Sequence, residues 1–325
     1  MKILITGGAG YIGSIVTEMC LAAGDDVTVY DNLSTGHRRA VPADARFVEG
    51  DVSDQERLAG VFRETGTEAV IHMAGFIEAG ESMRDPGKYF RNNTCRPVSL
   101  LEAMVEAGVG EILFSSTAAV YGNPVTELLD EDHPREPTNA YGESKLLFER
   151  LLDWYDRVHG IRHAALRYFN AAGATGERGE DHRPETHLIP LILQTALGRR
   201  GRIDIFGTDY PTPDGTCIRD YIHIADLGQA HLLALRSLER GSIHYNLGNG
   251  RGYSVREVID SVRRVTGRDF PVVESGRRAG DPGVLVASSE RISAELGWQP
   301  QHPSLDEIVA SAWEWHQSHP DGYQE

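Results

Sequence analysis

Two residues that could move a proton stand four positions apart in the stretch AYGESK at 140–145, namely Tyr141 and Lys145. Residues i and i+4 of an α-helix share one face, so both side chains can reach the same cleft. A free phenol has a pKa of about 10, too high for a base near neutral pH, whereas a neighbouring ammonium favours the phenolate. The pair therefore predicts a lysine-assisted base that accepts a proton from an alcohol, although such pairs also arise by chance as solvated surface residues.

A glycine-rich turn, GGAGYIG at 7–13, follows the first apolar run of the chain. It carries Gly7, Gly10 and Gly13 at three-residue spacing, and it also satisfies the G-x-G-x-x-G pattern through Gly8. Glycine allows a sharp turn and a close approach to a pyrophosphate, which the N–H groups of the following helix then bind. Because a strand pattern precedes the turn and a helical pattern follows it, the turn predicts a dinucleotide-binding site.

Acidic residues end the second and third apolar runs at Asp31 and Asp51. Asp31 can accept hydrogen bonds from an adenosine ribose diol and would repel a 2′-phosphate, which predicts NAD as the cofactor. Arg38 and Arg39 follow nearby, so NADP is disfavoured rather than excluded. Asp51 either reaches the adenine edge or caps the next helix, and the sequence leaves both interpretations open.

A hydroxyl-rich strand end, EILFSST at 111–117, supplies a third group at Thr117. Active residues of doubly wound sheets gather outside the carboxyl ends of the strands, so Thr117 either binds substrate or only forms a turn. The positive nicotinamide ring of NAD⁺ would add to the effect of Lys145 on Tyr141, and Lys145 could also hold the ribose hydroxyls. Together these residues predict a site for the oxidation of an alcohol.

The elements that must position these residues alternate between short apolar runs and helical patterns up to Asn170. Nearly continuous apolar runs suit strands that are covered on both faces, and the helical segments between them end at glycines. The expected strands are KILIT at 2–6, DVTVYD at 26–31, RFVEGD at 46–51, AVIHMA at 69–74, EILFSST at 111–117 and IRHAALRYFN at 161–170. This alternation predicts an α/β protein with a Rossmann-type doubly wound parallel sheet.

The composition of the chain changes after Asn170, where AAGATGERGEDHRPE is rich in glycine and charged residues. Such a segment indicates a domain boundary or a loop over a site. We therefore expect an NAD-binding Rossmann domain at 1–170 and a smaller mixed α/β domain at 171–325 that binds the substrate. The stretch 220–250 again shows a helix and then a strand, so it could return to the first sheet.

Composition and charge narrow the class of protein. The formal net charge of −16 argues against broad nucleic-acid binding, which needs many lysine and arginine contacts to phosphates. No apolar run approaches the ~20 residues of a membrane span, and the start MKILITGG leaves no room for a signal peptide, so we expect a cytoplasmic protein without membrane contact. Cys20, Cys95 and Cys217 form no C-x-x-C pair, which argues against a disulfide framework and a zinc site. We expect three buried thiols and no metal.

These motifs together resemble the extended short-chain dehydrogenase/reductase superfamily over nearly the whole chain. Its marks are a TGxxGxxG turn, here TGGAGYIG at 6–13, and a Ser/Thr-Tyr-Lys triad. Within it the chain looks most similar to the UDP-glucose 4-epimerase family. That closer resemblance rests on YDNLSTG at 30–36, GES at 80–82, RNN at 91–93, SSTAAVYG at 115–122, RYFNAAGA at 167–174, GTDYPTPDGTCIRDYIH at 207–223 and YNLGNGRGYSV at 245–255.

The resemblance implies NAD-dependent inversion of the C4 hydroxyl of a UDP-hexose through a transient 4-keto sugar. In this family the tyrosine takes the C4 hydroxyl proton, which assigns the base to Tyr141, its tuning to Lys145 and the contact with the C4 oxygen to Thr117. By likeness to related dehydrogenases it also implies a homodimer built on the exposed faces of the helices around 88–107 and 141–159.

By the same resemblance, two larger sets of residues bind the ligands. Those expected to contact NAD are, besides Tyr141 and Lys145, Gly7, Gly10, Tyr11, Ile12, Gly13, Asp31, Asn32, Ser34, Asp51, Val52, Ala74, Asn92 and Phe169. Those expected to contact the UDP-sugar are, besides Thr117, Asn170, Leu188, Phe206, Arg219, Arg278, Asp281 and Leu285. The two arginines supply the local positive charge that an acidic protein must place against a diphosphate.

Three positions depart from the family pattern. Ile77 stands where the family often has a lysine that contacts the cofactor, and Pro97 falls inside an expected helix that it would kink or end. Leu285 stands where some members have a bulky tyrosine that closes the pocket against N-acetylated sugars. The smaller side chain makes UDP-GlcNAc and UDP-GalNAc candidate further substrates.

Other functions stay open beside the interconversion of UDP-glucose and UDP-galactose. A nucleotide-sugar 4,6-dehydratase shares the oxidation step but needs a further acid, and Ala118 and Ala119 stand where relatives of that type carry acidic residues. Another 4-epimerase, of the UDP-xylose type, also stays open, as does an ordinary alcohol dehydrogenase that exchanges its nicotinamide at each turnover. A catalytically silent NAD-sensing scaffold would keep the glycine turn but lose Tyr141 or Lys145, and both are present.

Overall fold

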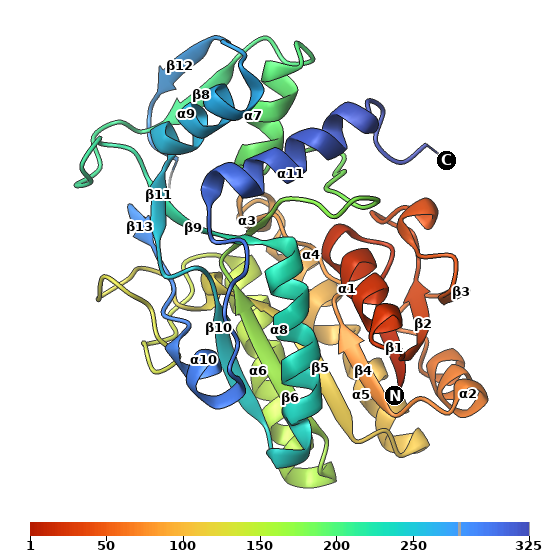
Figure 1. Cartoon of the computed structure of the whole chain (residues 1–325). Helices are drawn as coiled ribbons and strands as arrows, with labels where there is room; N and C mark the ends of the chain where they lie inside the picture. The colour runs from red at the N-terminus through yellow and green to blue at the C-terminus, as the bar shows by residue number, and fades with distance from the viewer. Residues whose placement is uncertain (279–280, 325) are drawn as a thin grey trace.

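A parallel sheet forms the larger part of the molecule (Figure 1). The structure, a computed structural model, describes residues 1–278 and 281–324. Within these residues the sheet has seven strands in the order β10-β6-β5-β4-β1-β2-β3, and each neighbouring pair is parallel. The strands are β1 (Lys2–Thr6), β2 (Asp26–Asp31), β3 (Arg46–Glu49), β4 (Ala69–His72), β5 (Glu111–Thr117), β6 (Arg162–Tyr168) and β10 (Ile243–Leu247). This order confirms the predicted Rossmann-type sheet.

Helices cover both faces of this sheet because its strands are apolar on both sides. Ile3 and Ile5 of β1 pack in one core with α1 and α8, whereas Leu4 between them packs in another core with α2, α5 and α6. Successive side chains of a strand point to opposite faces, so a sheet between two helical layers requires this alternation. None of the helices in the described residues has both the length and the apolar character needed to span a bilayer. The covering helices are α1 (Tyr11–Ala22), α2 (Gln55–Thr65), α5 (Val98–Ala107), α6 (Ala140–His159) and α8 (Ile224–Ser237).

The chain returns to the large sheet late in its sequence. β10 pairs in parallel with β6, with Ile243 opposite Ala164, and α8 packs against α1. The stretch 220–250 therefore contributes an edge strand and a covering helix to the sheet. The division of the chain into domains at 1–170 and 171–325 stays a prediction.

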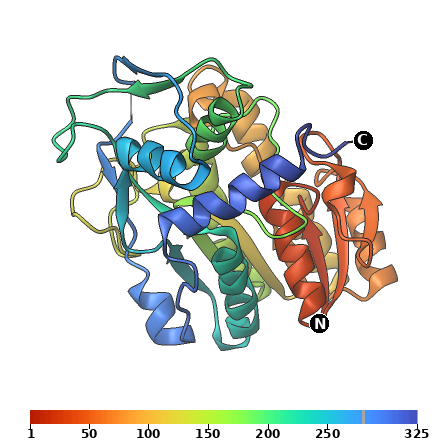
Figure 2. The same ribbon diagram turned by 45° about the horizontal axis from the view of Figure 1, so that its top comes forward.

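A smaller unit lies beyond the carboxyl ends of the large sheet (Figure 1). Its strand β9 pairs with β11, β13 and β7, while β8 and β12 form a separate pair, and α7, α9 and α11 share one apolar core. Figure 2 shows α11 running from this unit towards the N-terminal part of the chain, so the C-terminal segment lies near the start of the large sheet. The elements of the smaller unit are β7 (Asn170–Ala172), α7 (Leu188–Ala196), β8 (Ile203–Phe206), β9 (Ile218–His223), β11 (Gly252–Ser254), α9 (Val255–Thr266), β12 (Val272–Ser275), β13 (Val284–Leu285) and α11 (Leu305–Ser318). The helix α10 (Glu290–Leu296) packs instead against β10 and α8 of the large sheet.

The segment from 86 to 107 is helical but is interrupted. α4 (Pro86–Phe90) passes into a π-helical turn, η2 (Arg91–Cys95), and α5 begins only after Pro97, which is its N-cap. Proline has no backbone N–H group, so it stands at the break that the sequence predicted. The remaining short helices are α3 (Ala79–Ser82) and the 3₁₀ turns η1 (Arg38–Ala40), η3 (Ala118–Val120) and η4 (Leu238–Arg240).

Three predicted strands are shorter than the sequence indicated. The structure ends β3 at Glu49, β4 at His72 and β6 at Tyr168. After β6 the chain leaves the large sheet, and Asn170 begins β7, which pairs with β9 of the smaller unit. The apolar pattern could not mark this change, because the run stays covered as it passes from one sheet to the other.

The prediction of three buried thiols is wrong for one of them. Cys20 and Cys217 are buried, whereas Cys95 is exposed. Cys95 lies in the π-helical turn two residues after Asn93, which is 2% exposed. Positions two apart in a helix point to nearly opposite sides, so the turn that directs the asparagine inwards leaves the cysteine outside.

Candidate active site

The glycine turn lies between the end of β1 and the start of α1. Gly7 has a positive φ of 74°, and a Cβ atom there would stand 2.5 Å from the backbone nitrogen of Ala74. A Cβ atom on Gly13 would stand 2.2 Å from the carbonyl oxygen of Gly7, so only glycine lets α1 pack this closely on the turn. Gly10 is the N-cap of α1 and has no side chain to cap it, which leaves the N–H groups of Tyr11, Ile12 and Gly13 available to a phosphate, while that of Ser14 bonds to the carbonyl oxygen of Gly10.

Two carboxylates stand at the ends of β2 and β3. Asp31 accepts hydrogen bonds from the backbone N–H groups of Ala9, at 3.0 Å, and Leu33, at 2.8 Å. Burial raises the pKa of Asp31 and these hydrogen bonds lower it, with a net rise. The Asp51 carboxylate accepts a hydrogen bond from the side-chain amide of Asn32 at 2.9 Å. The structure therefore brings together three of the residues expected around the adenosine.

The start of α2 answers the question that the sequence left open about Asp51. The N-cap of α2 is Asp54, whose side chain accepts a hydrogen bond from the N–H group of Arg57. Asp51 instead accepts hydrogen bonds from the backbone and hydroxyl groups of Ser53, and Arg96 lies 3.5 Å away. Burial raises the pKa of Asp51, but its partners together hold it below the usual range. The capping interpretation is wrong, and the adenine contact stays a prediction.

The tyrosine and the threonine are brought together by the start of α6 and the end of β5. Asn139 caps α6 by accepting a hydrogen bond from the N–H group of Gly142 at 2.9 Å. A Cβ atom on Gly142 would stand 2.4 Å from the carbonyl oxygen of Ala119, so this glycine lets α6 begin against the residues that follow β5. This packing places the Tyr141 side chain beside that of Thr117.

Lys145 lies one turn further along α6 and is 3% exposed. Its Nζ donates a hydrogen bond to the carbonyl oxygen of Ser115 at 2.9 Å and lies 4.9 Å from the centre of the Phe114 ring. Burial lowers the pKa of Lys145 to about 8. A Cβ atom on Gly75 would stand 3.1 Å from Nζ, so the loop after β4 passes close to the ammonium. The lysine therefore lies where β4, β5 and α6 meet.

The pKa of Tyr141 shows how far the protein itself prepares this base. Burial raises the pKa of the phenol and the adjacent Thr117 side chain lowers it, with a net rise above the ordinary value of 10.0. Burial therefore outweighs the effect of Thr117 and favours the protonated phenol. A further positive charge is needed to favour the phenolate.

A buried asparagine that the sequence did not single out holds the loop after β4. The side chain of Asn93 accepts a hydrogen bond from the backbone N–H of Phe76 and donates to its carbonyl oxygen, both at 2.9 Å. It also donates to the hydroxyl of Ser144 on α6 at 3.1 Å. Its neighbour Asn92, expected at NAD, donates a hydrogen bond to the side chain of Asn93 at 3.1 Å. Ile77, which departs from the family pattern, directly follows Phe76 in this loop and is 41% exposed. The RNN motif contained this residue, but only burial distinguishes the two asparagines.

A buried ion pair joins β6 to α6 close to the ends of the strands. Arg167 donates to both carboxylate oxygens of Glu149, at 3.0 and 2.8 Å, and the two side chains are 1% and 0% exposed. The Ser116 hydroxyl donates to the same carboxylate at 2.6 Å, and Arg167 also donates to the Tyr121 hydroxyl at 2.9 Å. The signal in the sequence was an arginine inside the apolar run of β6 and a glutamate one turn after Lys145.

The residues expected at the UDP-sugar lie mostly on the smaller unit. Arg219 on β9 donates to Asp281 at 2.5 Å, and Leu285 on β13 stands opposite Arg219 in the strand register. The guanidinium carbon of Arg278 lies 4.0 Å from the centre of the Phe206 ring. The structure therefore forms two small groups, each with one of the predicted arginines.

The carboxylate of Asp220 joins the segments that carry these groups. It accepts backbone hydrogen bonds from Asn249 at 2.8 Å, Gly250 at 3.0 Å and Ala287 at 3.1 Å. Its own carbonyl oxygen accepts a hydrogen bond from the side chain of Asn170 at 2.9 Å. Asp220 is 0% exposed, so it is a structural connection between β7, β9 and the chain near β13.

The other predicted ligand residues lie at the margins of these groups. Phe169 and Leu285 pack against the same apolar cluster around Tyr121, whereas Leu188 packs on the core of α7, α9 and α11. Ser34 is exposed. Partly buried side chains, which a ligand could still contact, are those of Ile12, Val52, Ala74, Asn92, Phe169, Leu188 and Leu285.

Fold and site together define a class of protein. The sheet order, the glycine turn after its first strand and the Thr117–Tyr141 pair beside Lys145 are those of a Rossmann enzyme of the short-chain dehydrogenase/reductase type. The tight backbone at Gly7 and the uncapped start of α1 fit a pyrophosphate, and the position of Asp31 fits a ribose diol, so the residues present fit NAD.

Comparison with known proteins gives the family. The model of the NAD dependent epimerase/dehydratase family matches residues 3–248, and the chain belongs to this family. A UDP-glucose 4-epimerase of Lacticaseibacillus casei is 50% identical over 327 residues, which cover 99% of each chain. The crystal structure of a UDP-glucose 4-epimerase, 50% identical, superposes with a TM-score of 0.97 and covers 100% of both chains. That of UDP-glucose 4-epimerase from Bifidobacterium longum, in complex with NAD⁺ and UDP, is 35% identical, with a TM-score of 0.94, and covers 99% of this chain and 100% of its own.

Proposed function

We propose that this chain catalyses the NAD-dependent inversion of the C4 hydroxyl of a UDP-hexose and interconverts UDP-glucose and UDP-galactose through a transient 4-keto sugar. The observation that carries this function is that Tyr141 lies beside Thr117, with the buried Lys145 one helical turn further along α6. One short loop connects this group to the glycine turn, because Ala74 lies against Gly7 and the next residue lies against Lys145. The full-length likeness to UDP-glucose 4-epimerases supports the substrate class.

In this reaction Tyr141 takes the proton of the C4 hydroxyl as the sugar is oxidised, and it returns the proton when C4 is reduced on its other face. Thr117 holds the C4 oxygen through its hydroxyl. When bound, NAD⁺ supplies hydride transfer in both directions and the positive charge that favours the Tyr141 phenolate. Lys145, fixed to the carbonyl oxygen of Ser115, keeps a second positive charge close to the base and binds the ribose hydroxyls.

For the cofactor, we assign the pyrophosphate to the glycine turn and the start of α1, and the adenosine ribose to Asp31. The hydrogen bond between Asn32 and Asp51 supports their joint assignment to the adenine side. Arg38 lies with its guanidinium 4.4 Å from the centre of the Phe47 ring, which supports NAD over NADP because that charge has a partner other than a 2′-phosphate.

For the substrate, we assign the diphosphate to the two arginines of the smaller unit. Arg219 is 14% exposed and is oriented by Asp281, and Arg278 is oriented by the ring of Phe206. Guanidinium groups suit phosphate oxygens because they donate two parallel hydrogen bonds. Asn170 and Leu188 complete the predicted set from the two ends of the loop between β7 and α7.

A nucleotide-sugar 4,6-dehydratase is the alternative with the closest chemistry. It needs an additional acid near the keto sugar to eliminate water. The residues after Thr117 are Ala118, which is 7% exposed, and Ala119, whose carbonyl oxygen faces α6. Neither alanine can transfer a proton, which supports epimerisation.

For the sugar specificity we propose a role for Leu285. This residue is partly buried and packs against the cluster that also contacts Phe169. We propose that leucine, shorter than tyrosine, leaves room for an N-acetyl group, so UDP-GlcNAc and UDP-GalNAc are substrates as well. Replacing Leu285 with tyrosine should reduce turnover of the N-acetylated sugars and leave that of UDP-galactose nearly unchanged.

We also propose that two copies of the chain form a homodimer through α5 and α6. Two large apolar side chains on α6 are exposed four residues apart, Trp154 at 60% and Val158 at 65%. Such a pair on one helical face is suited to pack against an identical helix related by a twofold axis. Sedimentation of the purified protein tests this: the wild type should sediment as a dimer, and Trp154→Glu as a monomer.

We place the enzyme in the cytoplasm. The three cysteines in the described residues are free, and Cys95 is exposed, which suits a reducing compartment. Fractionation of cells that express the chain should recover its activity with the cytoplasmic markers.

The decisive test of the function uses purified protein without added cofactor. Incubation with UDP-galactose should yield UDP-glucose, resolved by chromatography, because bound NAD is regenerated within each turnover. Parallel incubations with UDP-GalNAc, UDP-xylose and dTDP-glucose define the specificity. A 4-keto-6-deoxy product from dTDP-glucose would replace the epimerase assignment with a dehydratase.

A further inference from the structure

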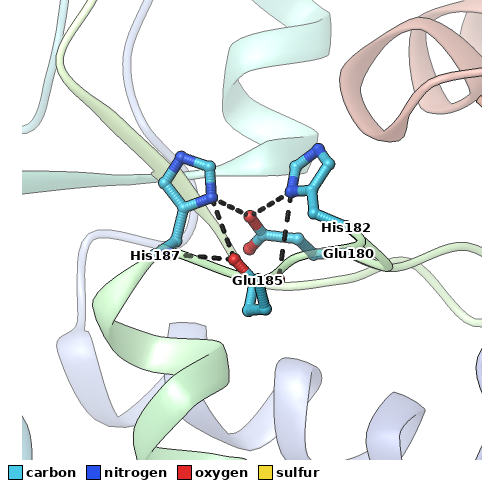
Figure 3. Close-up of side chains that lie close together, drawn as sticks. All are labelled: Glu180, His182, Glu185 and His187. Carbon is cyan, nitrogen blue, oxygen red and sulfur yellow. Dashed lines mark hydrogen bonds and ion pairs between the residues drawn. The ribbon is translucent and has the colours of Figure 1, made fainter. Parts of the chain in front are cut away.

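A cluster of two histidines and two glutamates lies in the loop between β7 and α7 (Figure 3). Its members form two Glu-x-His pairs, Glu180 with His182 and Glu185 with His187. Figure 3 shows both imidazole rings turned towards the two carboxylates. One nitrogen or oxygen atom from each residue lies within 4.8 Å of the other three. None of the four belongs to the residues assigned to NAD or to the UDP-sugar.

The shortest distances in the cluster join histidine Nδ1 atoms to carboxylate oxygens. Nδ1 of His182 is 3.1 Å from Oε1 of Glu180 and 3.9 Å from Oε2 of Glu185. Nδ1 of His187 is 2.6 Å from Oε1 of Glu180 and 3.3 Å from Oε1 of Glu185. Both histidines therefore converge on the same glutamate oxygen, and all four groups face one small volume.

The ring of His187 lies close to both carboxylates without a hydrogen bond from its Nδ1 atom to either of them. Its Nδ1 atom is buried and has no hydrogen-bond partner in the described residues, although Oε1 of Glu180 is 2.6 Å away. The distance suits a hydrogen bond, so it is the angle at the ring nitrogen that does not. A buried nitrogen that is close to two carboxylates without bonding to either is suited to a cation that all three share.

One of the two carboxylates, that of Glu185, is held by backbone N–H groups. Oε1 of Glu185 accepts hydrogen bonds from the backbone N–H groups of Thr186, at 2.7 Å, and His187, at 2.8 Å. The side chains of Glu180 and Glu185 are each 5% exposed. Such outer contacts orient the ligands of a metal ion. Two nearly buried carboxylates side by side also require a positive charge between them.

We propose that this cluster binds one divalent transition-metal ion, with Zn²⁺ the best match, through Glu180, His182, Glu185 and His187. Imidazole nitrogens and carboxylate oxygens bind zinc at about 2.0–2.2 Å, which places the four ligand atoms of a tetrahedron ~3.4 Å apart. To reach that spacing, Nδ1 of His187 and Oε1 of Glu180 must separate from 2.6 Å, and the wider pairs must close from at most 4.8 Å. Four protein ligands leave no open coordination position, so the ion is structural and takes no part in the sugar chemistry. The expectation of no metal rested on the cysteines and did not consider this motif.

The ion would stabilise the loop between β7 and α7, which lies between the regions proposed for the cofactor and the substrate. Tyr11, the first residue of α1, contacts the His182 ring edge-on and donates a hydrogen bond to the carbonyl oxygen of Gly173 at 2.6 Å. Leu188, expected at the UDP-sugar, directly follows His187 at the start of α7. Metal binding should therefore stabilise the fold without a direct effect on proton transfer.

An ion can enter and leave the cluster from the surface. Glu180, His182 and Glu185 line a pocket of about 420 Å³ together with Trp315 and His316 of α11. A chelator in solution therefore has access to a bound ion, which makes the site testable by removal and return of the metal.

The first test measures metal in protein purified without a metal-affinity step. Elemental analysis should find about one equivalent of zinc per wild-type chain and roughly a tenth of that in His187→Gln, which keeps a polar side chain of similar length. The matched control is His159→Gln, an exposed histidine at the end of α6, which should keep its metal. Wild-type protein that carries no stoichiometric divalent metal and takes up neither Zn²⁺ nor Co²⁺ would overturn the proposal.

The same variant locates the ion. Asp153, His163 and His244 form another group with ligand-like spacing in the described residues. Full metal content in His187→Gln would place the ion elsewhere, for example in that group, and would refute the assignment. Co²⁺ added to chelator-treated wild type should give the intense visible bands of a tetrahedral site, and these should be absent in the variant.

The second test measures thermal unfolding, which does not depend on the enzymatic assignment. Chelator treatment should lower the unfolding temperature of the wild type by about 5 °C or more, and added Zn²⁺ should restore it. His187→Gln should respond to neither treatment while keeping the circular dichroism and NAD binding of the wild type, which shows that it folds. Equal shifts in the wild type and the variant would mean that the metal acts elsewhere and would contradict the proposal.

Discussion

The regions proposed for catalysis and for substrate binding hold their cationic groups in opposite ways. Lys145 is 3% exposed and donates to a neutral carbonyl oxygen, that of Ser115. Arg219 is 14% exposed and is paired with Asp281, which is 33% exposed. A buried charge that is hydrogen-bonded only to neutral groups is not neutralised, so it can act on the neighbouring base and on a bound ligand. An arginine paired near the surface can exchange its carboxylate for a phosphate at little cost, because surface ion pairs are weak.

This difference separates the effects expected from mutation. In the catalytic region, removal of one group should alter the rate of the chemical step or the stability of the fold, because the surroundings are buried and specific. In the substrate region, removal of one group should mainly weaken binding, because the partner that remains is partly solvated. The following predictions test that contrast, from the largest expected effect to the smallest.

The largest effect is expected from Tyr141→Phe. The variant loses the proton acceptor but keeps the ring, so kcat for UDP-galactose should fall by roughly 10²- to 10⁴-fold while NAD binding is retained. Steady-state kinetics and the NAD content of the purified protein measure both outcomes. Activity equal to that of the wild type would remove Tyr141 from the mechanism. Tyr155→Phe, on an outer part of α6, is the matched control and should keep full activity.

The second prediction compares a buried and an exposed ion pair. Glu149→Gln leaves the charge of Arg167 buried without its carboxylate, so the free energy of unfolding should fall by about 3–5 kcal/mol. Asp209→Asn breaks the ion pair between Asp209, which is 74% exposed, and Arg277, which is 44% exposed. This substitution should change the free energy of unfolding by less than about 1 kcal/mol. Denaturant unfolding measures both. Similar losses in the two variants would show that burial does not distinguish these regions.

The third prediction concerns pH and Lys145. Its pKa is about 8 in the folded chain because of burial, and about 10.4 in an unfolded chain. Between these values the unfolded state binds more protons, so this residue makes the folded state more stable as pH rises, by about 1.4 kcal/mol per pH unit. Below about pH 8 the lysine is charged in both states and adds no pH dependence.

Lys145→Met isolates this contribution. The difference in unfolding free energy between nucleotide-free wild type and the variant should change steadily from pH 8 to pH 10, in favour of the wild type as pH rises, and should be constant from pH 6 to pH 7.5. Because other titrating groups are common to both proteins, they cancel in the difference. A flat difference across the whole range would mean that the lysine is not desolvated.

The smallest effect is expected from Arg219→Ala. Loss of a charged hydrogen-bond donor should raise KM for the UDP-sugar by roughly 10- to 100-fold, with a smaller change in kcat. Arg256→Ala, which breaks an exposed pair with Glu274, is the control and should leave KM unchanged. A fall in kcat as large as that of Tyr141→Phe would place Arg219 in the chemical step and remove the contrast between the regions.

Much of the cofactor side could be read from the sequence because its signals are local. The strands at 2–6, 26–31 and 111–117 have the bounds that the apolar runs predicted. The choice of NAD followed from a glycine turn and an acidic strand end, both within the first 31 residues. Family membership confirms that cofactor. Local spacing suffices here because the backbone of one βαβ unit shapes most of the pyrophosphate site.

The substrate side could be read only through its resemblance to a family. Arg219 and Asp281 are 62 residues apart, and no periodicity predicts that they meet. The same holds for Asn93, which reaches the loop after β4 and the hydroxyl of Ser144 on α6, 51 residues away. Such contacts depend on how helices and loops pack, and a one-dimensional pattern does not contain that information.

By itself, the sequence determined the parallel sheet, the dinucleotide turn and the placement of Tyr141 and Lys145 on one helical face, because each depends on residues a few positions apart. Only the tertiary structure decided which groups are buried together. It raised the pKa of Tyr141, lowered that of Lys145 to about 8, and folded the Glu-x-His pairs of residues 180–187 onto one small volume. The physical reason is that desolvation and the convergence of charges depend on distances through space, which are fixed only when the chain has packed.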